Sequence, residues 1–223
     1  RLYRATDAAK DQTYFLYRVT SDALQHTLFP LGGYTKQQVR HMATERGLWT
    51  AGKQESMGVC FVGNVGMRDF LSQYISTRPG DIIDKQTGAV LGQHDGAIFY
   101  TLGQRHGLDV GGGLPYYVVG KDMAANVVYV SRNMNDEAMW RHNVLVGDLH
   151  WIHGAPAASD QLTVRLRHRG QLRSCTLRYD SAQAQATLHL SDPERAVAAG
   201  QSAVIYRGTE CLGGGIVVDS VAL

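Results

Sequence analysis

The last 75 or so residues alternate short apolar runs with turn residues, and this spacing constrains the fold more than any other feature. The predicted strands are 162–169, 172–179, 184–190, 202–206 and 211–219. Several short strands at regular spacing are typical of an antiparallel barrel. Glycine is also frequent, at 25 of 223 residues, which favours many tight turns. The sequence therefore predicts a small antiparallel β-barrel at residues 138–223.

The front of the chain, residues 1–63, is predicted to be mainly helical. Aromatic and aliphatic residues recur at roughly helical spacing over 11–28, and a Pro-Leu-Gly-Gly turn ends that stretch. Thr35 is a suitable N-cap for a second helix, with Gln38 three residues later as in a capping box. Gly47 is a suitable C-terminal cap for the same helix.

The middle of the chain, residues 64–137, combines a helix with hairpins. The helix is predicted at 67–75. Two hairpins are predicted to follow, formed by 81–84 with 89–91 and by 116–119 with 126–130. The fold class that results is an α+β multidomain fragment, with a helical front, a small mixed α/β centre and a C-terminal antiparallel β-barrel.

Charge is distributed unevenly, although the formal net charge is only +2. Residues 1–60 carry eight basic and five acidic residues, 61–150 carry seven and nine, and 151–223 carry seven and six. An acidic middle therefore separates two basic ends. A local excess of arginine in the last region suits an anionic partner, although a solvated face is an equally simple explanation.

The strand predicted at 162–169 carries much of this positive charge. Apolar and basic residues alternate along it, with Leu162, Val164 and Leu166 on one face and Arg165, Arg167 and Arg169 on the other. Guanidinium groups spaced two residues apart are able to bind successive phosphates of a nucleic acid. The alternative is an ordinary barrel strand whose outer face is solvated.

Several classes of function lack their sequence signals. No apolar run is long enough for a membrane span, and no secretory signal is visible, so we expect no membrane partner. The nine histidines and three cysteines show no metal-ligand spacing, and no metal site is predicted. No nucleotide-binding glycine loop occurs, so the glycine clusters 111–113 and 213–215 are predicted to be turns or bulges. Three widely spaced cysteines favour a reducing compartment, and we expect a cytoplasmic location.

Cys60 is the thiol that best suits a function. Glycines on both sides of it would let a ligand approach closely, and Lys53 upstream would favour the thiolate. A single cysteine in an apolar strand is nevertheless more often a small buried hydrophobic residue. Cys175 and Cys211 fall in predicted barrel strands and are expected to be structural.

An ordered set of segments resembles one known family. The segments are Lys10–Leu16, Phe29–Gly32, Lys36–Arg40, Ser56–Gly63, Gly92–Gly96, Tyr100–Leu108, Gly200–Val204 and Cys211–Ile216. In this order they resemble the tRNA-specific 2-thiouridylase family over nearly the whole chain. The resemblance implies the helical tail of an α/β PP-loop catalytic domain at 1–63, a central domain at 64–137 and a tRNA-binding β-barrel at 138–223.

The resemblance also implies roles for particular residues. Cys60 would carry a persulfide sulfur to C2 of the wobble uridine, and would form a transient disulfide with a cysteine that this chain lacks. Contacts with tRNA are implied for Lys10, Asp11, Gln12, Arg167, His168 and Gln201. At His168 the sequence departs from the tyrosine expected of the family, although a ring that stacks or forms hydrogen bonds is kept.

Members of this family first activate the uridine with ATP, which an S-G-G-x-D-S loop binds together with Mg²⁺. This sequence contains no such loop and begins at Arg1 without methionine, so we expect a piece of a longer protein that is inactive by itself. The partners that the resemblance implies are a tRNA with a wobble uridine and a sulfur-donor protein, either a sulfur relay protein or a cysteine desulfurase.

Two other interpretations stay open. The chain would be a non-catalytic RNA-binding module if Cys60 were merely buried, and a free-standing sulfurtransferase of small thiols is a weaker third possibility. The reactivity of Cys60 distinguishes the first two, because a sulfur carrier must be accessible and a core thiol is inert.

Overall fold

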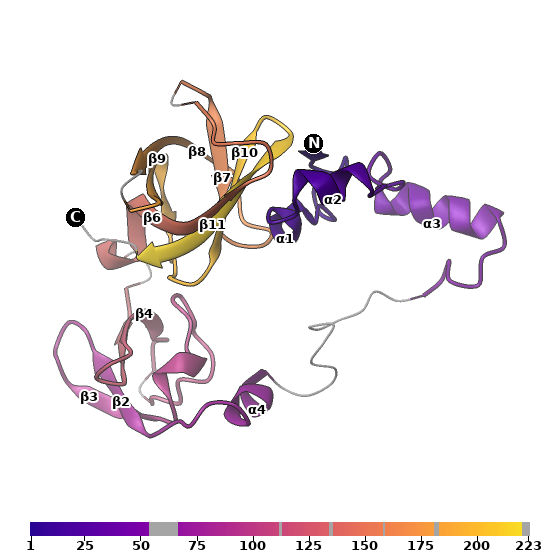
Figure 1. Cartoon of the computed structure of the whole chain (residues 1–223). Coiled ribbons are helices and arrows are strands. Elements are labelled where there is room, and N and C mark those ends of the chain that lie inside the picture. Colours follow the sequence, from indigo (N-terminus) through magenta and orange to yellow (C-terminus); the bar gives the residue numbers. More distant parts are fainter. Residues whose placement is uncertain (54–66, 112, 134–135, 158, 181–182, 220–223) are drawn as a thin grey trace. The chain divides into compact units, whose positions relative to one another are not determined.

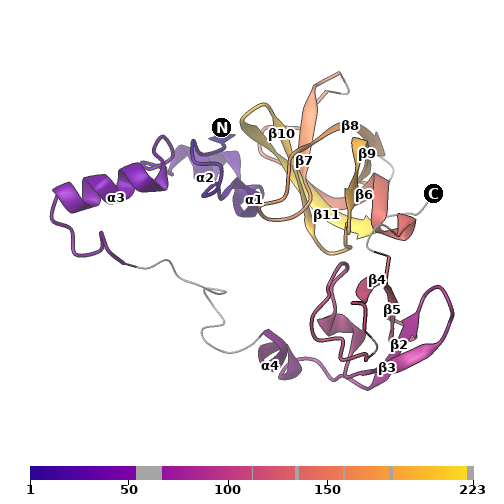
Figure 2. The same cartoon turned by 180° about the vertical axis from the view of Figure 1, so that it is seen from behind.

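A computed structural model describes most of the chain (Figure 1 and, from behind, Figure 2). The described residues are 1–53, 67–111, 113–133, 136–157, 159–180 and 183–219. They form two compact units, of which the first combines Arg1–Lys53 with Arg141–Leu223 and the second is Gln54–Trp140. The α+β multidomain organisation predicted from the sequence is confirmed. The three-way division at residues 63 and 137 stays a prediction.

The C-terminal part of the first unit is a closed β-barrel. Its strands are β6 (Trp140–Trp151), β7 (Leu162–Arg165), β8 (Arg173–Asp180), β9 (Gln185–Arg195), β10 (Ser202–Arg207) and β11 (Glu210–Asp219). They are hydrogen-bonded in the order β11-β10-β7-β8-β9-β6, and β6 pairs with β11 to close the ring. The short strand β1 (Leu2–Tyr3) adds to β11 from outside. The barrel is as predicted, with β6 as an additional strand.

The inward face of the barrel strands forms the core of this part. It is made of buried aliphatic side chains from every strand, among them Val144, Val146, Leu162, Val164, Leu188, Leu190, Ala203, Ile205 and Val217. Because side chains alternate along a strand, Leu162 and Val164 point inward and Arg165 points outward. The apolar half of the predicted alternation is therefore confirmed.

The basic half of that alternation is wrong in two respects. β7 ends at Arg165, and Arg167 to Gly170 form a turn in which Arg169 has a φ of +60°. Arg165 is only 6% exposed, because the first residues of the chain cover the outer face of β7. The three arginines therefore do not share one solvated face.

The triple glycine in β11 is a bulge, as predicted from the sequence. The register of β11 against β6 shifts between Gly214 and Ile216. Gly213 has a φ of +140°, and a Cβ there would lie 2.1 Å from the carbonyl oxygen of His150. Only glycine lets these backbones approach so closely.

The front of the chain contributes three helices, α1 (Thr13–Leu16), α2 (Ser21–Gln25) and α3 (Lys36–Glu45). The single helix predicted over 11–28 is wrong, because Thr20 is extended and its hydroxyl caps α2 by accepting the N–H of Ala23. The local signals around α3 are confirmed. Thr35 and Gln38 form the capping box, and Gly47 ends the helix with a φ of +61°.

The front segment packs on the outer face of the barrel. Buried residues from both parts make a second core, which consists of Leu2, Tyr14, Tyr17, Ile152, Val204, Tyr206 and Cys211. Figures 1 and 2 show α1 beside β10 and β11 in both views. The helical front and the barrel are thus one packed body, although 87 residues separate Lys53 from Arg141 in the sequence.

The second unit is a small mixed sheet with short helices. Its elements are α4 (Met67–Ser72), β2 (Gly80–Asp84), β3 (Val90–His94), η1 (Ala97–Phe99), β4 (Tyr117–Asp122), β5 (Val127–Ser131) and η2 (Glu137–Met139). The strand order is β3-β2-β5-β4, in which β2 and β5 are parallel. Both predicted hairpins are confirmed. In the described part of the chain, no helix is long and apolar enough to cross a membrane.

The close approach of the two backbones at the β11 bulge can be tested by mutation. Replacing Gly213 by alanine is expected to lower the free energy of unfolding by about 2–4 kcal/mol, because the new Cβ meets a backbone carbonyl and the backbone is strained. Gly33→Ala is the control, since a Cβ there would have no neighbour within 4 Å. Urea denaturation followed by circular dichroism measures both. Equal stability of the two variants would contradict the close approach.

Candidate nucleic-acid interface

A buried ion pair joins the front segment to the barrel. The Nη1 atom of Arg165 on β7 lies 2.9 Å from Oδ2 of Asp11, and the two residues are 6% and 3% exposed. The guanidinium carbon of Arg165 also lies 5.7 Å from the centroid of the Tyr206 ring. A buried carboxylate and a buried guanidinium neutralise one another here, so neither remains as an isolated charge.

Neighbouring groups satisfy the rest of the Asp11 carboxylate. The backbone N–H and the hydroxyl of Thr13 donate to Oδ1 at 3.2 Å and 2.9 Å. The Thr13 hydroxyl also lies 3.2 Å from the hydroxyl of Tyr206 on β10. Burial raises the pKa of Tyr206 to about 12, so this phenol stays neutral. Asp11 is thus fully engaged inside the protein, and the ion pair fixes the start of α1 against two barrel strands.

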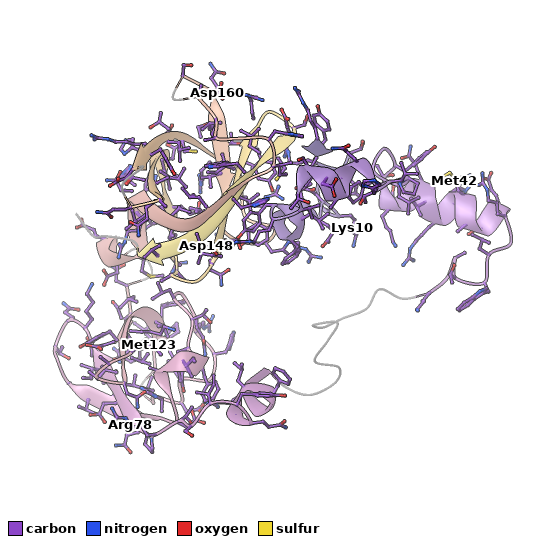
Figure 3. The ribbon with its side chains drawn as sticks, in the orientation of Figure 1. Lys10, Met42, Arg78, Met123, Asp148 and Asp160 are labelled. Atoms are coloured by element: carbon purple, nitrogen blue, oxygen red, sulfur yellow. The ribbon has the colours of Figure 1, made fainter. Side chains whose placement is uncertain are left out.

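Lys10 and Gln12 lie on either side of Asp11 in the sequence. Gln12 is exposed and occupies the N-cap position of α1, while Lys10 is half-buried. Figure 3 labels Lys10 in the helical segment beside the barrel. Both residues also line a cavity of about 670 Å³, whose other walls are mainly apolar and include Leu28, Phe29 and Leu31.

His168 meets α1 from the turn after β7. Its ring centroid lies 4.6 Å from that of Phe15 and 6.0 Å from that of Tyr14. Burial lowers the pKa of His168, and the nearby charges of Arg169 and Arg165 lower it further. The imidazole is therefore neutral at pH 7 and presents an uncharged ring.

Arg167 is held from one side and exposed on the other. Its Nη2 atom donates to Oε1 of the buried Glu194 at 3.1 Å, and Nε of Arg173 donates to the other oxygen at 2.5 Å. The Arg167 side chain is nevertheless 55% exposed. One buried carboxylate thus orients a guanidinium whose remaining N–H groups are available to a ligand.

Gln201 reaches the same region from the loop before β10. The hydroxyl of Tyr14 donates to the carbonyl oxygen of Ser202 at 3.1 Å, next to the exposed Gln201. Residues 10–12, 167–168 and 201 therefore gather around α1. Asp11 is the exception among them, because its side chain points into the protein.

Arg18 makes a further contact between the front segment and the barrel. Its Nη1 atom donates to Oδ2 of Asp148 at 2.7 Å, and both side chains are largely exposed. Asp148 is labelled on the barrel in Figure 3. The sequence alone predicted neither this ion pair nor the contacts of Glu194 with Arg167 and Arg173, because the residues that pair are far apart along the chain. It also gave no role to Phe15, although this residue lies in one of the segments that carry the resemblance.

Two of the three cysteines lie in described strands of the barrel. Cys175 on β8 and Cys211 on β11 are free and buried, and burial raises the pKa of each to about 12. The prediction that they are structural is confirmed. Cys60 and its predicted strand lie outside the described residues.

Comparison with known proteins places the chain in a family. Three family models match in order: a "tRNA methyl transferase HUP domain" at residues 1–64, a "tRNA methyl transferase PRC-barrel domain" at 68–132 and an "Aminomethyltransferase beta-barrel domain" at 141–217. The protein named tRNA-specific 2-thiouridylase MnmA of Listeria welshimeri is 41% identical over 99% of this chain, and that of Bacillus subtilis is 38% identical over 98%. The chain belongs to the tRNA-specific 2-thiouridylase family.

A third relative matches a similar share of its own length. The MnmA protein of Ralstonia pickettii is 44% identical over 97% of this chain. The chain spans 59% to 60% of the length of these three curated 2-thiouridylases. The family resemblance found in the sequence is thereby confirmed.

The buried ion pair can be tested with a double-mutant cycle. Asp11→Asn or Arg165→Met is each expected to lower the free energy of unfolding by about 3 kcal/mol, because each leaves one buried charge without a partner. The double variant is expected to cost less than the sum of the two. Urea denaturation of all four proteins provides the measurement.

Asp148→Asn serves as the matched control for that cycle. It removes an exposed ion pair between the same two parts of the chain, and it is expected to leave the unfolding midpoint nearly unchanged. An Asp11→Asn variant that is as stable as Asp148→Asn, or strict additivity in the cycle, would contradict the role of the buried pair.

Proposed function

We propose that this chain supplies the tRNA-binding part of a tRNA 2-thiouridylase, together with the cysteine that delivers the sulfur. One observation carries the tRNA-binding half of the proposal. Three separate stretches of the chain, 10–12, 167–168 and 201, come together around α1. Each of them holds residues for which the family resemblance implies contact with tRNA.

The chemistry of this surface suits RNA. An oriented arginine such as Arg167 binds a phosphate with two N–H groups, and the amide side chains of Gln12 and Gln201 are able to bind base edges or riboses. A neutral ring at His168 provides a face for stacking. The name of the relatives, tRNA-specific 2-thiouridylase, supports a tRNA uridine thiolated at C2 as the substrate. The family resemblance implies that this is the wobble uridine.

Cys60 is proposed as the sulfur carrier, which binds a persulfide sulfur and transfers it to the uridine. The two other thiols are buried within barrel strands with a pKa of about 12, and such thiols are poor nucleophiles. The alternative of a non-catalytic RNA-binding module is not favoured, because the relatives carry the name of an enzyme.

In the described part of the chain, the glycine cluster in β11 does not offer a loop for the phosphates of ATP. The glycine cluster at 213–215 is filled by backbone, since a Cβ at any of its three residues would lie within about 2.4 Å of a carbonyl oxygen. We therefore propose that ATP and Mg²⁺ bind residues outside this sequence, and that this chain alone does not thiolate tRNA. The sulfur-donor protein, the transient disulfide of Cys60 and the cytoplasmic location stay predictions.

The role of Cys60 can be tested in two ways. In the whole enzyme that contains this sequence, Cys60→Ser is expected to abolish the formation of 2-thiouridine, as measured by mass spectrometry of digested tRNA. Cys175→Ala is the control and is expected to retain activity. In the present chain, iodoacetamide at pH 8 is expected to modify Cys60 and to spare Cys175 and Cys211. An inert Cys60 would favour the non-catalytic module.

The tRNA-binding role can be tested separately through Arg167. Arg167→Ala is expected to weaken the binding of tRNA to this chain and to reduce the slope of log K against log salt concentration by about 1, as the loss of one phosphate contact requires. Arg178→Ala, which removes an exposed arginine of β8, is expected to change neither quantity. Equal effects of both variants would mean that the binding is nonspecific.

A further inference from the structure

We propose that Phe15 and His168 form a platform on which one unpaired nucleobase of the RNA stacks. The inference rests on the proposed function and extends it, because it names a binding residue, Phe15, and the chemical group that this residue receives.

Phe15 is exposed where its neighbours are buried. Its side chain is 60% exposed, whereas Thr13 and Tyr14 of the same short helix are buried against the barrel. An exposed phenylalanine forgoes the hydrophobic stabilisation that burial would give it. Such a ring on an otherwise polar surface marks a place where a ligand is able to cover it.

The rings of Tyr14 and His168 contact the Phe15 ring and support it. The Tyr14 ring lies next to it with the centroids 5.3 Å apart and the planes at 84°, and the hydroxyl of Tyr14 is hydrogen-bonded to the backbone of Ser202. On another side lies the His168 ring, tilted by 39°. The two rings that would receive the base are therefore held by each other and by Tyr14, which is hydrogen-bonded to the barrel, and this limits the conformational entropy lost on binding.

The electrostatics of the platform suit a base and its phosphates. His168 is neutral, because burial and the neighbouring charges of Arg169 and Arg165 lower its pKa, so its face is free to stack without a counter-ion. Arg167 and Arg169 are exposed on either side of His168 in the sequence. Stacking rings flanked by guanidinium groups are the arrangement with which proteins bind single-stranded RNA.

A protein segment is the other occupant to consider, and the surroundings of Phe15 favour RNA over it. Exposed polar residues adjoin its contacts: the carbonyl oxygen of Gln12 accepts the N–H of Phe15, Arg167 precedes His168 in the sequence, and Gln201 precedes Ser202. The front segment does have an apolar surface at Leu28, Phe29 and Leu31, but those residues line the cavity described above. Phe15 does not line that cavity.

The experiment asks whether RNA binding needs the aromatic ring of Phe15 or only an apolar side chain at this position. Phe15→Leu keeps an apolar side chain and removes the ring, whereas Phe15→Tyr keeps the ring. An anticodon stem-loop RNA with an unmodified wobble uridine is the probe. Phe15→Leu is expected to weaken its binding to the 223-residue chain by about 5- to 100-fold, and Phe15→Tyr by about twofold or less. Tyr179→Leu, which removes an exposed ring from β8, is the control and is expected to change nothing.

A fluorescent base identifies the stacking directly. 2-Aminopurine is placed at one loop position of the RNA at a time, and its fluorescence is quenched when it stacks on a ring. At one position or more, we expect quenching on binding of the unmodified chain and of Phe15→Tyr, and none with Phe15→Leu at saturating protein.

Three other outcomes would each contradict the platform, and they can be distinguished from one another. If Phe15→Leu binds and quenches like the unmodified chain, the platform is wrong while RNA binding through Arg167 stands. If both Phe15 variants lose affinity together with thermal stability, Phe15 supports the protein instead. If the unmodified chain does not bind the RNA at all, this inference fails together with the tRNA-binding role proposed above.

Discussion

The ion pair between Asp11 and Arg165 is the interaction on which the first unit depends. It is buried and charged, so removing either partner leaves the other as a buried charge without its counter-ion. It sets the position of α1 on the barrel, and thereby places Lys10, Gln12 and Phe15 near Arg167, His168 and Gln201, which the barrel itself carries. Asp11 thus contributes to this surface by holding its neighbours, although its own carboxylate faces inward.

The interface shows how a nearly neutral chain is able to suit a polyanion. The formal net charge is +2, and the arginines of the barrel are not arranged as one stripe. Arg165 neutralises Asp11 in the interior, and Arg167 shares Glu194 with Arg173. The groups that remain at the surface are a few hydrogen-bond donors, such as the guanidinium of Arg167, beside the uncharged rings of Phe15 and His168. The suitability of this surface for an anionic ligand therefore depends on where a few groups are placed, and not on the total charge of the chain.

Local signals in the sequence predicted the ends of α3 and the inward face of β7 correctly, although they missed the break at Thr20. Contacts between distant residues were not predicted. Thr35, Gln38 and Gly47 define the ends of α3 through contacts within a few residues, and the alternation of Leu162 and Val164 identifies the inside of the barrel. Alternation separates two faces of a strand, but it does not reveal that another segment covers the outer one. For that reason the sequence did not predict a buried Arg165, nor the contact of His168 with α1. The residues implied for tRNA contact came from the family resemblance, and it was the fold that brought them together.

The discontinuous first unit has a consequence for the way in which the protein is made. Asp11 and Arg165 are separated by 154 positions, and the whole central unit is synthesised between them. At a translation rate of about 5–20 residues per second, α1 waits on the order of 10 to 30 s on the ribosome before its partner strand exists. During that time Tyr14, Tyr17 and Leu2 have no barrel to cover them. The front segment is therefore able to complete its packing only after most of the chain has been synthesised.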